Sequence, residues 1–183
     1  ALLASVNLSY ALNTGSGPNN GHAAYARARA GAEAEWDVFR YDARLTWTLP
    51  WRMQAVGVFE GQIAGAPLIP GEQFGVGGVS SVRGFEERGV TGDSGQRVTA
   101  ELWAPPLPYD LRVLGFVDAG HVVRYHLQPG EVGDDVMVST GAGLRWQWRQ
   151  NLAVALDYGH ELKAPQTPNA GGIKWHFSLT CRY

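Results

Sequence analysis

The stretch VMVSTGAGLRWQWR, residues 136–149, alternates between two kinds of side chain. Most of its even positions are apolar, whereas its odd positions from 139 onward are small, polar or charged. The apolar set is Val136, Val138, Ala142, Leu144, Trp146 and Trp148, and the other set is Ser139, Gly141, Gly143, Arg145, Gln147 and Arg149. A period of two is typical of a β-strand with one apolar and one polar face. We therefore predict a two-faced strand here.

The same alternation recurs on both sides of this stretch, and we count about eight strands and no convincing helix. The other strands are predicted at 3–12, 37–49, 53–62, 95–103, 111–123, 152–161 and 173–183. Short connections lie near 49–52, 105–110 and 149–151, and long ones lie near 13–35, 63–94, 124–134 and 162–172. The alanine- and arginine-rich run at 23–36 is interpreted as strand extension or as loop.

Short turns at one end and long loops at the other are typical of an outer-membrane β-barrel, whose strands turn apolar residues out and polar residues in. Aromatic residues near the strand ends fit the belts found at membrane interfaces. These are Trp47, Trp51, Trp146, Trp148, Trp175 and Tyr183. The alternative is a soluble β-sandwich or a lipocalin-like barrel. A soluble barrel would carry many lysines outside, and this chain has only Lys163 and Lys174.

Composition narrows the function classes. The chain has 183 residues, a net charge of −2 and 17% charged residues, where soluble domains have about 25%. The balance of charge gives no electrostatic footprint for nucleic acid. There is no run of 18 apolar residues that would predict a transmembrane helix. Cys181 is the only cysteine, so no internal disulfide is possible.

The long loop at 63–94 bears on the size of the barrel. An eight-stranded barrel has interior room only for side chains, so this loop could not fold into it. A loop of this length inside the lumen requires more strands, and open strand edges are not tolerated in lipid. We therefore expect residues 1–183 to be the C-terminal part, about eight strands, of an all-β transmembrane barrel with roughly twice as many strands.

The run EGQIAGAPLIPGEQFGVGGVSSVRGFEERGVTGDSGQRVTAEL, residues 60–102, carries a family resemblance. It resembles the C-terminal barrel of the two-partner secretion transporters, the haemolysin activators and haemagglutinin exporters of Gram-negative bacteria. Their GQ, EQF, SVRGF, GD.G and EL elements are all present. Downstream, FVDAG at 116–120 and GAGLR at 141–145 resemble two further family strands.

The resemblance implies a barrel of about 16 strands in the cell outer membrane, preceded by periplasmic polypeptide-binding modules that are absent from this chain. It implies a pore that moves an unfolded exoprotein to the cell surface. The loop at 63–94 is implied to fold back into the lumen as a lid, with Arg83 meeting Asp118 on the wall. Without the resemblance, Arg83 would be interpreted as a solvated loop arginine.

The residues themselves fit this lid. Asp118 and Glu101 lie on the polar faces of their strands, and a guanidinium matches a carboxylate in geometry and charge. The expected latch consists of Val82, Arg83, Gly84, Phe85, Glu101 and Asp118, with Gly77 and Gly78 permitting tight backbone turns. Phe85 is expected to pack where the loop meets the lumen; as a plain loop feature it would be an ordinary anchor.

Other functions are weighed against this one. A barrel-assembly insertase of the same superfamily shares VRGF and would show weak closure between its first and last strands. An outer-membrane barrel protease or lipase would need a catalytic cluster at the extracellular rim. GDSG at 92–95 matches a serine-protease motif, but only His22 precedes Ser94, so we expect no catalytic role.

Neither cofactor nor metal is expected. The glycines at 75–78 have no P-loop context, and the five histidines share no ligand spacing. The final strand ends in alternating apolar residues and an aromatic terminus. Phe177 and Tyr183 resemble the signal by which the barrel-assembly machinery recognises its clients. The expected partners are therefore this machinery, the secreted exoprotein, and outer-membrane lipid and lipopolysaccharide, without nucleic acid.

Overall fold

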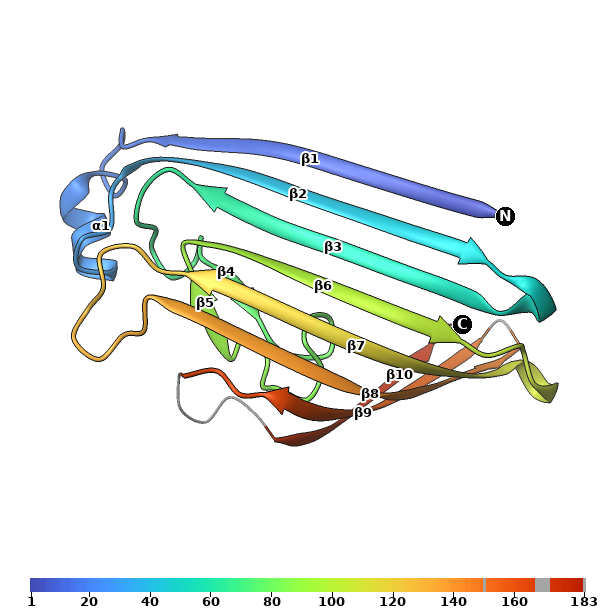
Figure 1. Ribbon diagram of the computed structural model, residues 1–183. Coiled ribbons are helices and arrows are strands. Elements are labelled where there is room, and N and C mark those ends of the chain that lie inside the picture. Colours follow the sequence, from blue (N-terminus) through green and yellow to red (C-terminus); the bar gives the residue numbers. More distant parts are fainter. Residues whose placement is uncertain (150, 167–171, 183) are drawn as a thin grey trace.

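A computed structural model describes residues 1–149, 151–166 and 172–182. One antiparallel sheet of eight strands has the order β1-β2-β3-β6-β7-β8-β9-β10 (Figure 1). Its strands are β1 (Leu2–Thr14), β2 (Glu35–Thr48), β3 (Gln54–Ala64), β6 (Ser94–Trp103), β7 (Leu111–Val123), β8 (Asp134–Trp148), β9 (Leu152–Lys163) and β10 (Ile173–Cys181). Each pairs with its neighbour in sequence, apart from the insertion between β3 and β6. The predicted all-β antiparallel fold is confirmed.

The connections alternate in length, as the sequence predicts. At one end, the 3₁₀ turns η1 (Pro50–Arg52) and η2 (Pro108–Asp110) join β2 to β3 and β6 to β7. Both turns follow a leucine–proline pair and place an aromatic residue in the left-handed region, with φ 57° at Trp51 and 65° at Tyr109. The long connections lie together at the opposite end of the sheet (Figure 1). The two ends of the sheet are therefore built differently.

The two faces of the sheet differ in the sense predicted. One face carries large apolar side chains that are open to the surroundings; Phe177, for example, is 67% exposed. Similar residues on this face include Val6, Leu8, Tyr10, Phe59, Val98, Val117, Trp175 and Leu179. The opposite face carries polar groups such as Gln62 and Asp118, which the long insertion covers. An apolar face left uncovered over this length is what a lipid-facing sheet requires.

Two elements were not predicted. The helix α1 (His22–Ala28) lies in the run 23–36, so the expectation of no helix is wrong. Its sequence, HAAYARA, is rich in alanine, the best helix former, and it buries Tyr25. The strands β4 (Phe74–Val76) and β5 (Val90–Gly92) form a small hairpin inside the insertion.

Within the described residues, no helix has the length and apolar character needed to cross a membrane.

The sheet curves, and it is open within the described residues, with β1 and β10 as its edges (Figure 1). The insertion lies on the inner side of the curve, where β4 contacts β6 and β7, and β5 contacts β7. The buried apolar core is formed there, between the insertion and the sheet. Its members are Val76, Val82, Phe85, Val90, Val122 and Met137. The core therefore fixes the insertion in place against the polar face.

Candidate functional site on the inner face

The insertion at residues 63–94, which we call the lid loop, reaches the wall of the sheet through its VRGF sequence. Val82 and Phe85 are fully buried in the apolar core that joins the loop to β7 and β8. Because Val82 and Phe85 flank Arg83 and Gly84, their burial directs the arginine at the sheet. The structure thus brings together all four residues of this part of the expected latch.

Arg83 binds the carboxylate of Asp118 on β7 through three hydrogen bonds. Its Nε donates to Oδ2 at 2.8 Å, its Nη2 to Oδ1 at 2.9 Å and its backbone N–H to Oδ2 at 3.1 Å. Both residues are buried, with 4% of Arg83 and none of Asp118 exposed. The paired side-chain bonds match the fork of the guanidinium to the carboxylate and so fix its orientation.

Three further groups surround the guanidinium. Glu101 on β6 accepts a bond from Arg83 Nη1 at 2.9 Å. The Phe116 ring lies beneath the guanidinium, with its centroid 3.5 Å from Cζ, in a cation–π arrangement. Asp157 on β9 lies 3.7 Å from Nη1 and receives two bonds of 2.9 Å from Arg145. Asp157 and Phe116 were not identified from the sequence; both belong to polar-facing positions of strands that were.

Burial lowers the pKa of Arg83, but the hydrogen bond and charge of Asp118, followed by those of Glu101, outweigh it and raise the pKa above its ordinary value. Arg83 therefore stays a cation throughout the physiological range. A buried cation needs its partners, since removing one leaves an uncompensated charge. The arrangement selects one position of the loop more than it adds general stability.

Backbone contact between Gly84 and Gly159 allows the loop to lie this close to the sheet. Gly84 has φ +95°, a left-handed value that favours glycine. A Cβ on Gly159 would lie 2.4 Å from the Gly84 nitrogen and 2.8 Å from the Arg83 carbonyl carbon. Gly84 was expected from the VRGF motif, whereas Gly159, its counterpart on β9, was not expected from the sequence. The two glycines together bring Arg83 within reach of Asp118.

Gly77 and Gly78 shape the turn that precedes VRGF. Both have positive φ, +106° and +100°, as a tight left-handed turn requires. A Cβ on Gly77 would lie 2.4 Å from the carbonyl oxygen of Glu86, on the returning arm of the loop. These two residues therefore hold the arms of the lid loop together, at a distance from the ion pair itself.

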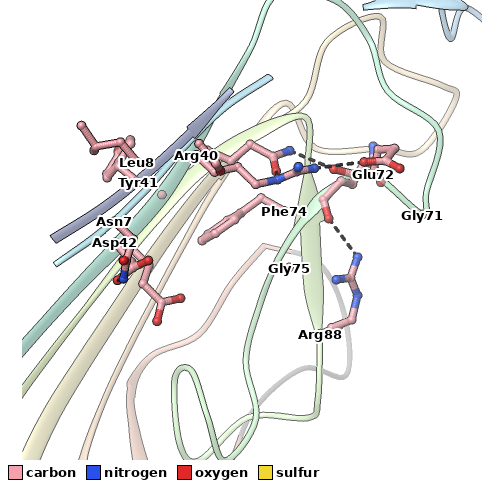
Figure 2. A pocket seen from close by; sticks show the side chains of 15 residues that line it. Asn7, Leu8, Arg40, Tyr41, Asp42, Gly71, Glu72, Phe74, Gly75 and Arg88 are labelled. Atoms are coloured by element: carbon pink, nitrogen blue, oxygen red, sulfur yellow. Dashed lines mark hydrogen bonds and ion pairs between the residues drawn. The ribbon is translucent and has the colours of Figure 1, made fainter. Parts of the chain in front are cut away.

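On the side of β1 to β3, the lid loop leaves a polar cleft of about 570 Å³ (Figure 2). Arg40 on β2 crosses it to Glu72 of the loop at 3.0 Å and to Gln62 at 2.8 Å. More than a third of each of the Arg40 and Glu72 side chains is exposed. This rim contact is consequently weaker than the buried one at Arg83.

The remaining candidate residues lie away from the Arg83 site. Phe177 lies on the apolar face of β10, and Tyr183 lies outside the described residues. Ser94 Oγ accepts a bond from Ala64 N–H and shares one with the Tyr125 hydroxyl, so it has a structural position at the start of β6. Among the described residues, no cluster of three or more His, Cys, Asp or Glu side chains is arranged to hold a metal ion.

Comparison with known proteins gives concordant results. The family model for haemolysin secretion/activation proteins ShlB/FhaC/HecB matches residues 2–146. The outer membrane transporter CdiB of Dickeya dadantii (strain 3937) is 30% identical over 96 residues, which make up 50% of this chain and 17% of that protein. The solved structure of CdiB from Acinetobacter baumannii matches with a TM-score of 0.65 and 26% identity, over 81% of this chain and 28% of that one. The chain thus spans less than a third of each relative's length.

Proposed function

Because the chain belongs to the haemolysin secretion/activation family ShlB/FhaC/HecB, whose members are two-partner secretion transporters of the outer membrane, we propose that it forms part of a pore for an unfolded exoprotein. The exoprotein passes from the periplasm to the cell surface, and folding outside supplies the drive. No covalent bond is broken. Residues 1–183 form part of a barrel of roughly 16 strands, and residues 63–94 form its lid.

The buried ion pair of Arg83 and Asp118 is the observation that carries the proposal. A loop fastened to the inner wall of a barrel occupies the route through it, so the loop must move before a polypeptide can pass. The polar cleft on the other side of the loop supports the same view, because the exposed contact of Arg40 with Glu72 bridges it, while Leu68 at the start of the loop packs against Val38 and Ala64. Within the latch, Arg83 is the residue of the loop that binds, and Glu101 and Asp118 are the carboxylates of the wall that accept its hydrogen bonds.

The partners follow from this function. The exported protein is the main partner, and lipid and lipopolysaccharide surround the apolar face. The barrel-assembly machinery reads the final strand, including Phe177 and Tyr183, during insertion. Phe177 lies on the apolar, lipid-facing side of the sheet and not in the pore. Its role is therefore in insertion of the barrel and not in transport.

Secretion of the cognate exoprotein, sought first as a large secreted protein encoded by a neighbouring gene, tests the proposal. Arg83→Ala should reduce the amount in the culture supernatant, because the loop loses its defined position, and should leave the amount of folded transporter in the outer membrane unchanged. Arg40→Ala, which removes the exposed rim contact on the same loop, is the matched control and should export near the parental level.

Unchanged secretion in both Arg83→Ala and Asp118→Ala variants would remove the functional role of the pair. A fall in other outer-membrane barrels, with export intact, would instead indicate an insertase. The two results are separated by measuring supernatant and membrane fractions from the same culture.

A further inference from the structure

The GDSG sequence at 92–95 forms a second buried polar centre, apart from the Arg83 site. Asp93 is fully buried, at the point where the lid loop ends and β6 begins. It pairs with Arg29, from the end of α1, through a bond of 2.7 Å from Nη1 to Oδ1. Arg29 is itself only 8% exposed. A buried charge pair at a loop junction fixes the position of the groups that bind it, because water cannot take the place of a lost partner.

The remaining bonds to the Asp93 carboxylate come from the lid loop and from the loop after β7. Oδ1 accepts from the backbone N–H of Leu68 at 2.7 Å and from Gln73 Nε2 at 3.3 Å. Oδ2 accepts from the backbone N–H of Tyr125 at 2.6 Å. One carboxylate therefore joins the beginning and the end of the lid loop to a neighbouring long loop.

Arg29 completes the connection from the third loop. Its Nη1 also donates to the Leu68 carbonyl at 3.0 Å, and its Nη2 donates to the Tyr125 carbonyl at 2.7 Å. The loop containing α1 and the loop after β7 touch again where Gln128 Nε2 donates to the Ala30 carbonyl at 2.8 Å. Arg29 Nη2 also lies 3.7 Å from the partly exposed carboxylate of Glu131 in the loop after β7. Three of the long connections are thus fastened to one another around Arg29 and Asp93.

The glycines on either side explain why this centre lies flush with the sheet. A Cβ on Gly92 would lie 2.7 Å from the Val123 carbonyl oxygen, and one on Gly95 would lie 2.7 Å from the His121 carbonyl oxygen. Both obstacles are backbone atoms of β7, which cannot move aside. Because Gly92 and Gly95 have no side chains, the segment around Asp93 can lie directly against β7. This gives the GDSG sequence a packing role.

We propose that Asp93 and Arg29 are positioning residues that hold the three long loops together as a closure of the surface end, distinct from the Arg83 latch on the wall. The end with the long loops is the one that faces outward in an outer-membrane barrel. The importance of this closure for export rests on the proposed function; the closure itself does not. It can therefore be tested without any exoprotein.

Cysteine accessibility on intact cells tests the closure. Ala32→Cys, in a Cys181→Ser background, places a thiol at a site that is 6% exposed and packed between Tyr25, Ala34 and Ile69 of the lid loop. Labelling by a membrane-impermeant maleimide should rise by about tenfold or more when Asp93→Asn or Arg29→Met is added. Arg29→Met leaves Asp93 buried without its cation, and Asp93→Asn leaves Arg29 with only the partly exposed Glu131, 3.7 Å away. Arg29→Lys keeps the charge without the fork and should give a smaller rise.

Lys174→Met is the matched control, because it removes a cation from an exposed ion pair with Glu86 of the same lid loop and should change labelling by less than about twofold. Heat-modifiable migration on gels must show that the barrel is folded in each strain. If the Asp93→Asn variant does not reach the membrane, the labelling of the Arg29→Met variant decides whether the closure exists. Labelling at the parental rate in the folded variants would overturn the closure, whatever happens to secretion. Raised labelling with normal secretion would uphold the closure and count against the proposed transport route.

Discussion

The lid loop is held by two buried ion pairs that differ in what they join. At its tip, Arg83 is a cation that meets carboxylates of the sheet wall, and most of the bonds involve side chains. At its end, the Asp93 carboxylate accepts from the Arg29 guanidinium and the Tyr125 backbone N–H of two neighbouring loops. It also accepts from the Leu68 backbone N–H and the Gln73 side chain of the lid loop itself. The first pair fixes the loop against the wall, and the second fixes loops to one another.

This difference indicates which contact is suited to release. Breaking the tip contact releases one short segment, Val82 to Phe85, from the sheet wall, while the hairpin of β4 and β5 stays paired. Breaking the contact at Asp93 loosens three connections at once, because their backbone bonds depend on the same carboxylate. A loop that must move during transport would therefore be expected to open at its tip first. The variants below test this order through a cysteine introduced by Val82→Cys, at a fully buried site beside the latch, in a Cys181→Ser background.

Asp118→Ala should have the largest effect on the tip. It removes three hydrogen bonds and leaves Arg83 buried beside Glu101 and the already paired Asp157. Loss of one partner from a buried ion pair costs about 3–5 kcal/mol, so labelling at position 82 should rise on the order of a hundredfold. Labelling at position 32 should rise far less. Equal rises at both positions would mean that the two attachments form one unit.

Gly159→Ala should have the next largest effect. The new Cβ would lie 2.4 Å from the Gly84 nitrogen, so the loop backbone must shift away from β9. Overpacking of this kind costs about 1–3 kcal/mol. Gly57→Ala on β3 is the matched control, because nothing lies within 4 Å of its Cβ position. If both variants label position 82 at the same rate, the glycine contact has no part in docking the loop.

Arg83→Lys should have a smaller effect on labelling and a clear effect on export. Lysine keeps the positive charge but presents a single ammonium, which cannot form the paired bonds to Asp118. We expect a loss of about 1–2 kcal/mol in loop docking, and secretion between the levels of the parent and Arg83→Ala. Full parental secretion would show that charge alone is sufficient and that the fork is not needed.

Lys174→Met should have the smallest effect on the lid loop. The pair of Lys174 and Glu86 is exposed on both sides, and such pairs contribute less than about 1 kcal/mol. Labelling at position 82 should stay within about twofold of the parent in low and high salt. A large rise would indicate that the outer arm of the loop, and not its tip, controls docking.

Much of the fold followed from the alternation of side chains, since a period of two and the two lengths of connection determine an antiparallel sheet and its ends. The family resemblance drawn from VRGF and FVDAG is confirmed by the family model and the relatives. Helix α1 was missed because its seven residues show no apolar periodicity, and β4 and β5 because three residues carry no readable pattern.

The inner site divides in the same way. Arg83 and Asp118 could be named because each belongs to a motif, and Glu101 because it shares a polar face. Gly159 could not be assigned to the site, because a contact between β9 and a loop far away in sequence leaves no local signal. Phe116 shares the polar face of Asp118, but an aromatic residue there does not by itself indicate a cation–π partner. Asp93 was identified only as part of the GDSG motif; its role depends on three loops meeting, and sequence spacing does not report this.

A reversible disulfide between the lid loop and β7 tests the central claim most directly. A Cβ on Gly120 would lie 3.0 Å from Val82 Cγ2, and a disulfide places each Sγ roughly 3 Å from the opposite Cβ. With Val82→Cys and Gly120→Cys in a Cys181→Ser background, export of the cognate exoprotein should stop when the bridge is oxidised and resume on reduction, while each single variant exports. Undiminished export through the fully oxidised protein would contradict the claim that this loop must move for the polypeptide to pass.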